Sequence, residues 1–429
     1  MRIERLGDVA HVEISGIDKK TKDGESSVRL CNFTDVYYNW AITKNMYDGF
    51  MKASASDGDI DSFTLCKGQV AITKDSETRD DIGVATYIAD DFDDVVLGYH
   101  CALITPKEGI PEEKRVYGKY LNALLHTKYA QKYFSNNATG SGQRYTLSKD
   151  TIEDMPINIP SFKEQKRIGD YLSDIDHKIE LNNIVNDELE RMAKQIYDYW
   201  FVQFDFPNEE GKPYKSSGGK MVWNETLKRE IPDGWSEAPL SSISSVENGA
   251  TPSTLEEDNY GGNIGWITPK DLSNKGAKFF AKGERSITQK GYDSCGTTLL
   301  PAGSILMSSR APIGLVAIAS DEVCTNQGFK NIVPNEINDR FFLFYYIKKY
   351  MPFIEAMGNG TTFKEVSKDS LLSFPIMKVN NTNVYRKWVQ IAKNIFEKQK
   401  KLEMETDELQ SLRDYLLPLL MNGQITIKD

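Results

Sequence analysis

The stretch GSGQRYTLSKDTIEDMPI, Gly140–Ile157, returns later in the chain as GNGTTFKEVSKDSLLSFPI, Gly358–Ile376. Superposing the two SKD tripeptides, which begin at Ser148 and Ser367, gives an offset of 219 residues. The same offset aligns the proline near the end of each stretch. Self-similarity at a fixed period indicates an internal repeat. The sequence therefore predicts two copies of one unit of roughly 200 residues.

The similarity extends beyond this stretch on both sides. Downstream, DELERMAKQIYDYW from Asp187 matches DELQSLRDYLLPLL from Asp407. Upstream, four fainter pairs follow in the same order in both copies: RLGDVAHVEISG with PLSSISSVENGA, NFTDV with TPKDL, DIGVATYI with PIGLVAIA, and ALITP with KNIVP. Because chance does not produce this many ordered pairs, we interpret the chain as a duplication whose upstream parts have diverged.

The upstream part of each copy mixes strand and helix patterns. Short runs rich in β-branched residues, bounded by Gly, Pro or Asp, predict strands at GQVAIT, VATYI, GSILMS and GLVAIA. Apolar residues at helical spacing predict helices at YLNALLHTKYAQKYF and FFLFYYIKKYM. Each copy should therefore contain a globular head of mixed α/β (α+β) class.

The downstream part of each copy has the pattern of a coiled coil, because its apolar positions recur at alternating steps of four and three. The seam consists of Ile168, Leu172, Ile175, Ile179, Asn182, Leu189 and Ile196 in the first copy, and of Ile395, Leu402, Thr406, Leu409 and Leu416 in the second. For either helix alone, an amphipathic helix packed on its own head is the alternative. If the two helices pair, connectivity makes them antiparallel, about a pseudo-two-fold axis.

These patterns divide the chain into five segments. We predict a first head over 1–158, a first long helix over 159–204, a linker over 205–235, a second head over 236–377 and a second long helix over 378–429.

Composition restricts the class of protein. A formal charge of −10 excludes a uniformly basic nucleic-acid coat, so a DNA-binding surface must be a local patch. The five cysteines form no CxxC pair, which disfavours a disulfide framework or a zinc knuckle. No apolar run reaches the roughly 18 residues of a membrane span. The N-terminus MRIERLGDVAHVE has no apolar signal-peptide core. We therefore expect a cytoplasmic protein without a membrane partner.

Catalytic motifs are missing from the sequence. The segment SSGGKM, Ser216–Met221, lacks the first glycine and the Ser or Thr of a phosphate-binding loop. No NPPY-like tetrapeptide is present to hold a flipped adenine, and the four histidines have no metal-ligand spacing. We expect no catalytic residue, no metal ligand and no cofactor bound by this chain.

The order of these features resembles the specificity subunit of type I restriction-modification enzymes. The resemblance spans essentially the whole chain. Its most specific parts are the helix start KEQKRI, with Glu164 and Gln165, the link GGKMVWNETLKREIPDGW, and the close LLPLLMNGQI. The second copy departs from the pattern, because VNNTNVYRKW replaces the Glu-Gln start and leaves the beginning of its helix less defined.

The resemblance implies a function. Such subunits carry two target-recognition domains, each of which reads one half of a bipartite DNA target. Their helices set the spacer and dock two modification (methyltransferase) subunits. S-adenosylmethionine, ATP and Mg²⁺ would be bound by partner subunits, including two restriction subunits that translocate and cleave DNA. The chain itself would be non-catalytic. A stand-alone, sequence-specific DNA-binding regulator with two heads is the alternative, and it predicts tight specific binding by this chain alone.

DNA reading requires cations for phosphates and polar side chains for base edges. Candidates in the first head are Lys19, Lys20, Lys22, Arg29, Asn32, Lys74, Arg79, Gln143, Arg144 and Tyr145. Candidates in the second head are Thr251, Ser253, Lys270, Ser308, Ser309, Arg310, Asn326, Gln327, Thr361, Thr362 and Lys364. The two Gly-rich loops are favoured, because they occupy equivalent places and differ in chemistry. For each residue, an ordinary surface or turn role is the alternative.

Overall fold

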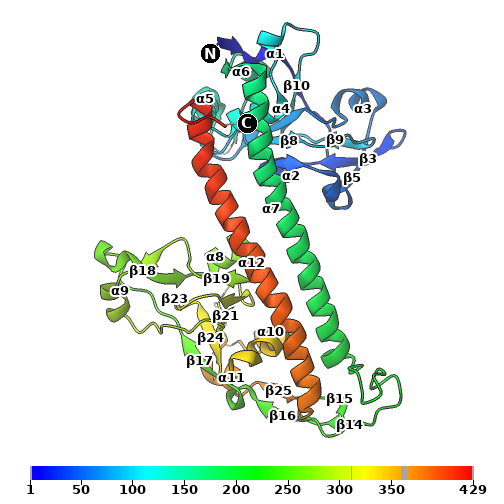
Figure 1. Cartoon of the computed structure of the whole chain (residues 1–429), viewed down its shortest axis with the longest axis vertical. Helices are drawn as coiled ribbons and strands as arrows, with labels where there is room; N and C mark the ends of the chain where they lie inside the picture. Colours follow the sequence, from blue (N-terminus) through cyan, green and yellow to red (C-terminus); the bar gives the residue numbers. More distant parts are fainter. Residues whose placement is uncertain (1, 143, 311, 359–364, 428–429) are drawn as a thin grey trace. The chain divides into compact units, whose positions relative to one another are not determined.

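The computed structural model describes residues 2–142, 144–310, 312–358 and 365–427 (Figure 1). The chain forms two compact units, Met1–Leu181 with Thr406–Asp429, and Asn182–Glu405. Each unit contains one head and a stretch of each of two long helices, α7 (Phe162–Tyr197) and α12 (Thr382–Met421).

The first head is built from short strands and helices. Its strands are β1 (Arg2–Arg5), β2 (Ala10–Ile14), β3 (Ser26–Cys31), β4 (Ala41–Ile42), β5 (Met51–Ala55), β6 (Val70–Thr73), β7 (Asp75–Ser76), β8 (Ala85–Ile88), β9 (Val95–Leu97), β10 (Cys101–Pro106), β11 (Thr139–Ser141), β12 (Arg144–Thr146) and β13 (Pro156–Ile159). Its helices are α1 (Leu6–Val9), α2 (Phe33–Tyr38), α3 (Asp57–Phe63), α4 (Gly118–Leu125), α5 (Lys128–Asn137) and α6 (Lys149–Glu153).

The second head repeats this plan after a hairpin of β14 (Met221–Asn224) and β15 (Arg229–Pro232). Its strands are β16 (Ser236–Pro239), β17 (Ser244–Asn248), β18 (Tyr260–Ile267), β19 (Phe279–Phe280), β20 (Ser286–Ile287), β21 (Ile305–Ser308), β22 (Val316–Ala319), β23 (Val323–Thr325), β24 (Phe329–Pro334) and β25 (Pro375–Lys378). Its helices are α8 (Pro269–Lys275), α9 (Gln289–Asp293), α10 (Arg340–Ala356) and α11 (Lys368–Leu372).

Sheet topology confirms the duplication. The main sheet has the order β2-β10-β6-β8-β4 in the first head and β17-β24-β21-β22-β19 in the second. In both, only the last pair, β8 with β4 and β22 with β19, is parallel. A three-stranded sheet, β5-β3-β9 or β20-β18-β23, has one antiparallel and one parallel pair in each head. The predicted mixed α/β class is confirmed.

The four faint sequence pairs fall on equivalent elements. They align β2 with β17, α2 with α8, β8 with β22 and β10 with β24. The α2 and α8 helices even begin with the same device, a capping box made by Asn32 with Asp35 and by Thr268 with Asp271. Such a box satisfies two backbone donors that the first helical turn leaves unpaired. The upstream alignment is therefore confirmed as homologous structure.

Each main sheet is covered on both faces. Alternate residues of a strand point to opposite faces. In β6, Val70 and Ile72 pack in one core with α4 and parts of α7 and α12, whereas Ala71 packs in another with α2 and the three-stranded sheet. The same alternation recurs in β21, where Ile305 and Met307 face the helices and Leu306 faces the small sheet.

One predicted helix is divided. The segment YLNALLHTKYAQKYF forms two helices, α4 and α5, separated at His126 and Thr127. The Thr127 hydroxyl accepts a hydrogen bond from the backbone N–H of Ala130, which makes this residue the N-cap of α5. A threonine in a helical apolar pattern can therefore start a new helix, because it supplies a side-chain acceptor for the first turn.

The long helices bury the predicted seam. Ile168, Leu172, Ile175, Ile179 and Asn182 of α7, and Ile395, Leu402 and Thr406 of α12, are buried; Leu189, Ile196, Leu409 and Leu416 are half-buried. Within the second unit, the Asn182 amide donates to Glu405, the Asn186 amide to Glu403, and the Gln399 amide to Glu190. Residue numbers rise along α7 as they fall along α12, so the predicted antiparallel pairing is confirmed there.

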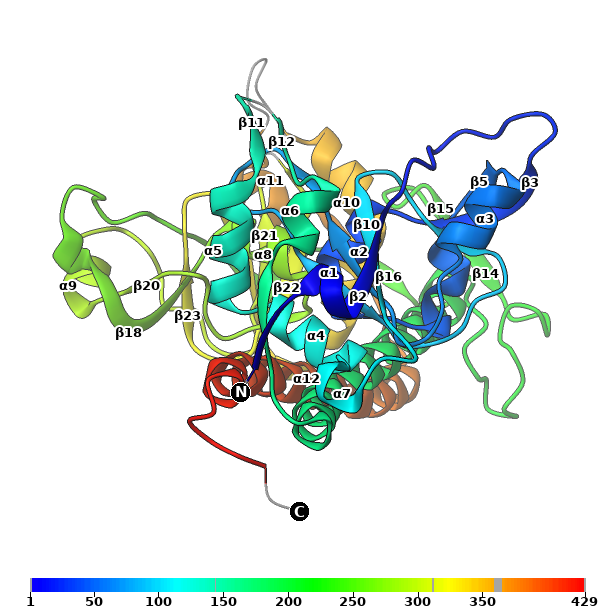
Figure 2. The ribbon, with the colours of Figure 1, turned by 90° about the horizontal axis from the view of Figure 1, so that it is seen from above.

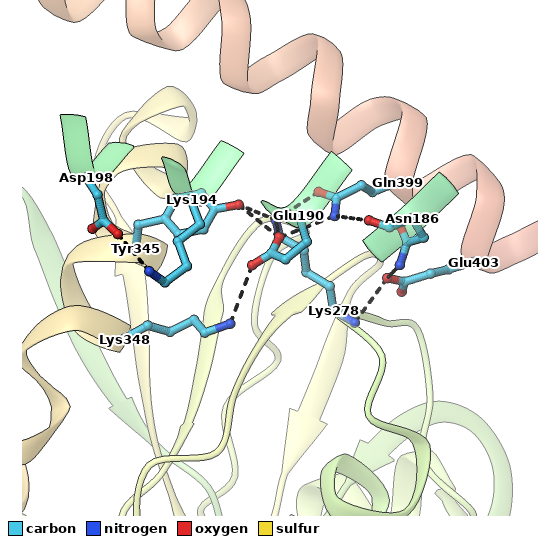
Figure 3. Close-up of polar contacts among 9 residues, drawn as sticks. All are labelled: Asn186, Glu190, Lys194, Asp198, Lys278, Tyr345, Lys348, Gln399 and Glu403. Atoms are coloured by element: carbon cyan, nitrogen blue, oxygen red, sulfur yellow. Dashed lines mark hydrogen bonds and ion pairs between the residues drawn. The ribbon is translucent and has the colours of Figure 1, made fainter. Parts of the chain in front are cut away.

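A buried lysine joins the second head to both helices (Figure 3). The Lys278 ammonium, which precedes β19, lies 2.7 Å from Glu190 of α7 and donates to Gln399 of α12 at 2.9 Å. The Tyr345 hydroxyl of α10 donates to the same Glu190 carboxylate at 2.9 Å. Burial lowers the pKa of Lys278 to about 8, although Glu190 opposes this shift. We call Lys278, Glu190 and Gln399 the second joint.

The first head is joined to the helices by different side chains. Trp40, which precedes β4 as Lys278 precedes β19, lies against the Arg413 guanidinium of α12, 4.6 Å from the ring centroid. Arg413 in turn forms an ion pair with Asp176 of α7, with 3.2 Å between the nearest N and O atoms. We call Trp40, Arg413 and Asp176 the first joint.

Candidate nucleic-acid interface

Three segments cross at the end of the main sheet in each head. In the first head, the backbone N–H of Lys74 donates to His100 and that of Leu147 donates to Lys74, both at 2.8 Å. In the second head, Ser309 donates to Gly328 at 2.8 Å and Val366 donates to Ser309 at 3.1 Å. The crossing therefore has the same backbone in both heads. We call it the strand-end site.

Four residues form the strand-end site of the first head: Lys74, Asp75, His100 and Arg144. The Asp75 carboxylate lies 2.8 Å from the Lys74 ammonium and 3.1 Å from the Arg144 guanidinium, and the His100 Nδ1 atom lies 2.7 Å from the same oxygen. Arg144 lies on β12, which forms a hairpin with β11 (Figure 2). Residues far apart in the sequence thus meet on one carboxylate.

Only one cation of this site faces solvent. The Arg144 side chain is 55% exposed, whereas that of Lys74 is 10% exposed. Burial by itself raises the pKa of the Asp75 carboxyl, but the hydrogen bond from Lys74 and those from Thr146 and His100 outweigh it. The pKa of Asp75 therefore lies well below its ordinary value, and the carboxylate is charged at neutral pH. The buried Lys74 thus keeps the Asp75 carboxylate ionised, and this carboxylate binds the exposed Arg144.

The position of His100 depends on unusual backbone. Its φ is 75°, in the left-handed region that residues with a side chain seldom adopt. This conformation places His100 directly before β10, where its ring also contacts Tyr99, with 4.1 Å between centroids. The Tyr99 ring lies under the Arg144 guanidinium, 5.8 Å away. Strain of this kind persists only where the surrounding structure enforces it.

Three residues form the strand-end site of the second head: Arg310, Lys330 and Glu365. The Glu365 carboxylate accepts a hydrogen bond from Arg310 Nε at 3.0 Å and one from the Lys330 ammonium at 2.8 Å. Burial alone raises the pKa of the Glu365 carboxyl, but the hydrogen bonds from these two cations outweigh it and lower the pKa. The Arg310 side chain is 49% exposed and that of Lys330 is 10% exposed.

The two strand-end sites contain the same kinds of residue, but these residues come from different segments of the backbone crossing. Each consists of a buried lysine, a carboxylate and an exposed arginine. The backbone crossing places Arg310 where the first head has Asp75, and Glu365 where it has Thr146. The acid and the arginine have therefore exchanged sides. Two heads of one fold thus present their exposed guanidinium from opposite segments of the same site.

The remaining candidates of the first head have other surroundings. Lys19, Lys20 and Lys22 are exposed in the loop before β3, where Lys22 lies 3.6 Å from Glu25. Arg29 is half-buried and donates to the Tyr47 carbonyl at 3.0 Å. Arg79 lies over the Tyr145 ring, 5.3 Å from its centroid, so both are near the strand-end site.

Four of the predicted contacts have structural roles within the heads. Asn32 caps α2, and the buried Lys74 ammonium is used on Asp75. In the second head, the buried hydroxyls of Ser308 and Ser309 donate to the carbonyls of Pro312 and Gly328. Lys74, Ser308 and Ser309 are buried and Asn32 is half-buried, so all four have structural roles, and their contact with DNA stays a prediction. A sequence cannot distinguish a buried polar group from an exposed one.

Other candidates of the second head lie at the surface. Thr251 donates to Gln327, Asn326 accepts from the backbone N–H of Gly328 at 2.9 Å, and Lys270 pairs with Glu284 at 3.1 Å. Ser253 is exposed. The predicted contacts Gln143, Thr361, Thr362 and Lys364 lie outside the described residues.

Sequence reasoning missed Asp75, His100, Lys330 and Glu365. Acidic residues were not sought, because a DNA-binding site was expected to be basic. The left-handed His100 carries no signal in its sequence neighbourhood. One signal existed for Glu365: the offset of 219 that aligns the SKD tripeptides places it opposite Thr146, within the favoured loop region.

The described residues contain neither a metal-ligand cluster nor a membrane-spanning helix. Across residues 2–142, 144–310, 312–358 and 365–427, no group of three or more His, Cys, Asp or Glu side chains could hold a metal ion. In the same ranges, every helix is too short or too polar to cross a bilayer.

Comparison with known proteins gives consistent matches. The sequence model of the type I restriction modification DNA specificity domain matches residues 2–191 and 232–411. The type I restriction enzyme MjaIX specificity subunit of Methanocaldococcus jannaschii is 38% identical over 158 residues, which cover 35% of this chain and 37% of that protein. The HindI specificity subunit of Haemophilus influenzae is 26% identical over 402 residues, 82% of this chain and 85% of that one.

The fold has a solved counterpart. The crystal structure of the S subunit of a type I restriction-modification system from M. genitalium matches 98% of this chain and 95% of its own, with a TM-score of 0.59 at 14% identity. This likeness concerns the fold alone. The two matches of the family model fall on the two copies described above and together cover most of the sequence. The chain belongs to the type I restriction-modification DNA specificity family.

Proposed function

We propose that this chain is the DNA sequence-recognition subunit of a type I restriction-modification complex. The observation that supports this most directly is the pair of strand-end sites. Two heads share one fold and one backbone crossing, yet they present their exposed arginines from different segments. A protein that reads a DNA target in two different halves needs such a pair, because base edges differ in their donors and acceptors.

The proposal extends to the partners. The two long helices dock two modification subunits and set the spacer between the half-sites. S-adenosylmethionine is bound by those subunits, and ATP and Mg²⁺ by two restriction subunits. The chain itself carries no catalytic group and acts on DNA in the cytoplasm. Family membership and the predicted lack of catalytic motifs support this division of labour.

Reconstitution tests the proposal. The purified chain should transfer no methyl group from S-adenosylmethionine to DNA. The chain with its modification subunit should methylate DNA at a two-part motif, as read by sequencing the modified bases. Methylation by the chain alone, surviving stringent purification, would contradict the proposal. Tight and specific DNA binding by the chain alone would favour the stand-alone regulator instead.

A further inference from the structure

We propose that Arg144 and Arg310 each read a guanine, one in each half of the DNA target. This inference rests on the proposed function and names the reading residue of each head. It starts from the shared plan of the strand-end sites: in each, a carboxylate with a buried lysine partner holds one exposed arginine.

The geometry leaves hydrogen-bond donors free for DNA. Arg310 uses Nε on Glu365, and within the described residues no other hydrogen bond reaches its two terminal nitrogens. Arg144 uses one terminal nitrogen on Asp75 and Tyr99, with the His100 Nδ1 atom 2.9 Å from the same nitrogen, and its Nε and other terminal nitrogen make no hydrogen bond in the same ranges. The two terminal nitrogens of Arg310 form a fixed fork that matches the O6 and N7 acceptors of guanine in the major groove, and the free N–H groups of Arg144 can donate to the same acceptors.

The carboxylate favours a base over a phosphate as the target. A phosphate contact needs net positive charge and tolerates loose geometry, since its gain comes largely from released counterions. An adjacent carboxylate reduces that charge and repels the phosphate. The same carboxylate fixes the guanidinium in one orientation, which lowers the entropy lost when a directional hydrogen bond forms. The arrangement therefore suits base discrimination.

A buried lysine contacts the carboxylate of each strand-end site. Lys74 and Lys330 are buried on the carboxylates and are too enclosed to contact DNA. The Asp75 carboxylate is buried and the Glu365 carboxylate is half-buried, and a second cation offsets the cost of removing each from water. Each lysine thus helps to keep charged the carboxylate that orients the arginine. Of the lysine, the carboxylate and the arginine described in each site, only the arginine both faces solvent and carries free donors.

Replacing Arg144 or Arg310 by lysine distinguishes a contact with a base from a contact with a phosphate. The complex of chain and modification subunit is prepared as wild type, Arg144→Lys and Arg310→Lys. Methylation rates are measured on duplexes in which each position of both half-sites is varied in turn. Lysine keeps the charge but loses the fork. We expect each variant to lose discrimination of about 10- to 100-fold at one G·C pair of one half-site and to retain it at every other position.

A matched control comes from the second head. Arg285 is exposed, lies 3.7 Å from the centroid of the Tyr260 ring, and has no carboxylate partner among the described residues. Arg285→Lys should leave all base preferences unchanged. Arg144→Gln and Arg310→Gln, which remove the charge, should relax the same G·C pairs as the lysine variants. Circular dichroism melts establish that each variant is folded.

The outcomes are distinct. Unchanged base preferences in the lysine variants, an equal loss on all sequences, or a change at an A·T pair would overturn the guanine assignment. Relaxation of both half-sites by one substitution would overturn the assignment of one arginine to each half. A wild-type complex that shows no two-part motif would instead contradict the proposed function, independently of any arginine variant.

Discussion

The two heads share every strand pairing of their main sheets, but they are joined to the helices by unlike side chains. The first joint places the tryptophan of the head against an arginine of α12, which pairs with Asp176 of α7. The second joint places a lysine of the head between Glu190 of α7 and Gln399 of α12. Trp40 and Lys278 occupy equivalent positions, since each carbonyl accepts from the neighbouring strand, from Tyr87 and Ile318. Duplication thus preserved the backbone while the polar contacts were rebuilt.

Removing the cation of each joint should have unequal effects. Lys278→Met leaves the half-buried Glu190 carboxylate with one other ion-pair partner among the described residues, Lys348 at 3.5 Å, and should destabilise the second unit by about 3 kcal/mol. Arg413→Met should cost the first unit about 1 to 2 kcal/mol, because Asp176 can take up a proton. Hydrogen exchange of the backbone amides of α12, at 395–405 and at 413–421, measures the two losses separately. Equal losses would mean that the joints are equivalent.

A pair of equivalent glycines tests the packing of the two heads. Gly83 and Gly314 precede β8 and β22, with φ of +79° and +94°. An added Cβ would lie 2.3 Å from the ring of Phe134 at Gly83, but 2.8 Å from the flexible Met351 side chain at Gly314. Gly83→Ala should therefore cost about 3 kcal/mol and Gly314→Ala about 1 kcal/mol, as judged by thermal unfolding. A larger effect at Gly314 would show that the phenylalanine moves more readily.

Acid titration should distinguish the two joints, because their acidic residues change the free energy of unfolding with pH in opposite directions. Burial raises the pKa of Asp176 to about 6, although Arg413 opposes the shift. Between pH 4 and 6 the folded first unit thus binds more protons than the unfolded chain, and its stability falls as pH rises. Burial also acts on Glu190, but Lys278 outweighs it and lowers the pKa to about 2. The contribution of Glu190 to the stability of the second unit is therefore lost as pH falls from about 4.5 toward 2.

Two amide substitutions isolate these contributions. Asp176→Asn should remove about 2 kcal/mol of pH dependence between pH 4 and 6, measured as the difference in unfolding free energy from wild type. Glu190→Gln is the matched control: its difference from wild type should change in the opposite direction and by less than about 1 kcal/mol over that range, because the carboxyl of the unfolded chain titrates near pH 4.5. A constant difference for Asp176→Asn would show that the carboxyl is ionised throughout.

Most of the fold could be predicted from the sequence because it depends on periodicity and repetition. The β-branched runs marked β6, β8, β21 and β22, and the four ordered pairs aligned the two heads correctly. The small sheets β5-β3-β9 and β20-β18-β23 were not foreseen. Their registers depend on tertiary packing, and β9, β20 and β23, which have only two or three residues, carry little local signal.

The strand-end sites could be predicted only in part. Arg144 and Arg310 were recognised by their residue type and position in or near loops. Their carboxylate partners were not, because Asp75 is 69 residues from Arg144 and Glu365 is 55 residues from Arg310. Contacts at such separation are set by the crossing of three backbone segments. Local pattern therefore finds the exposed cation, whereas the group that orients it requires the fold.

The pairing of β1 with β13, and of β16 with β25, has a consequence for how such proteins change. Arg2 lies opposite Ile159, and Ser236 lies opposite Lys378, so the chain enters and leaves each head on adjacent strands. Neighbouring strands are only about 5 Å apart. Recombination between related genes, with crossovers at the codons for these two strands, can therefore exchange a complete head. The chain segments on either side of the new head then keep their spacing. Such an exchange replaces the head and leaves the long helices unchanged.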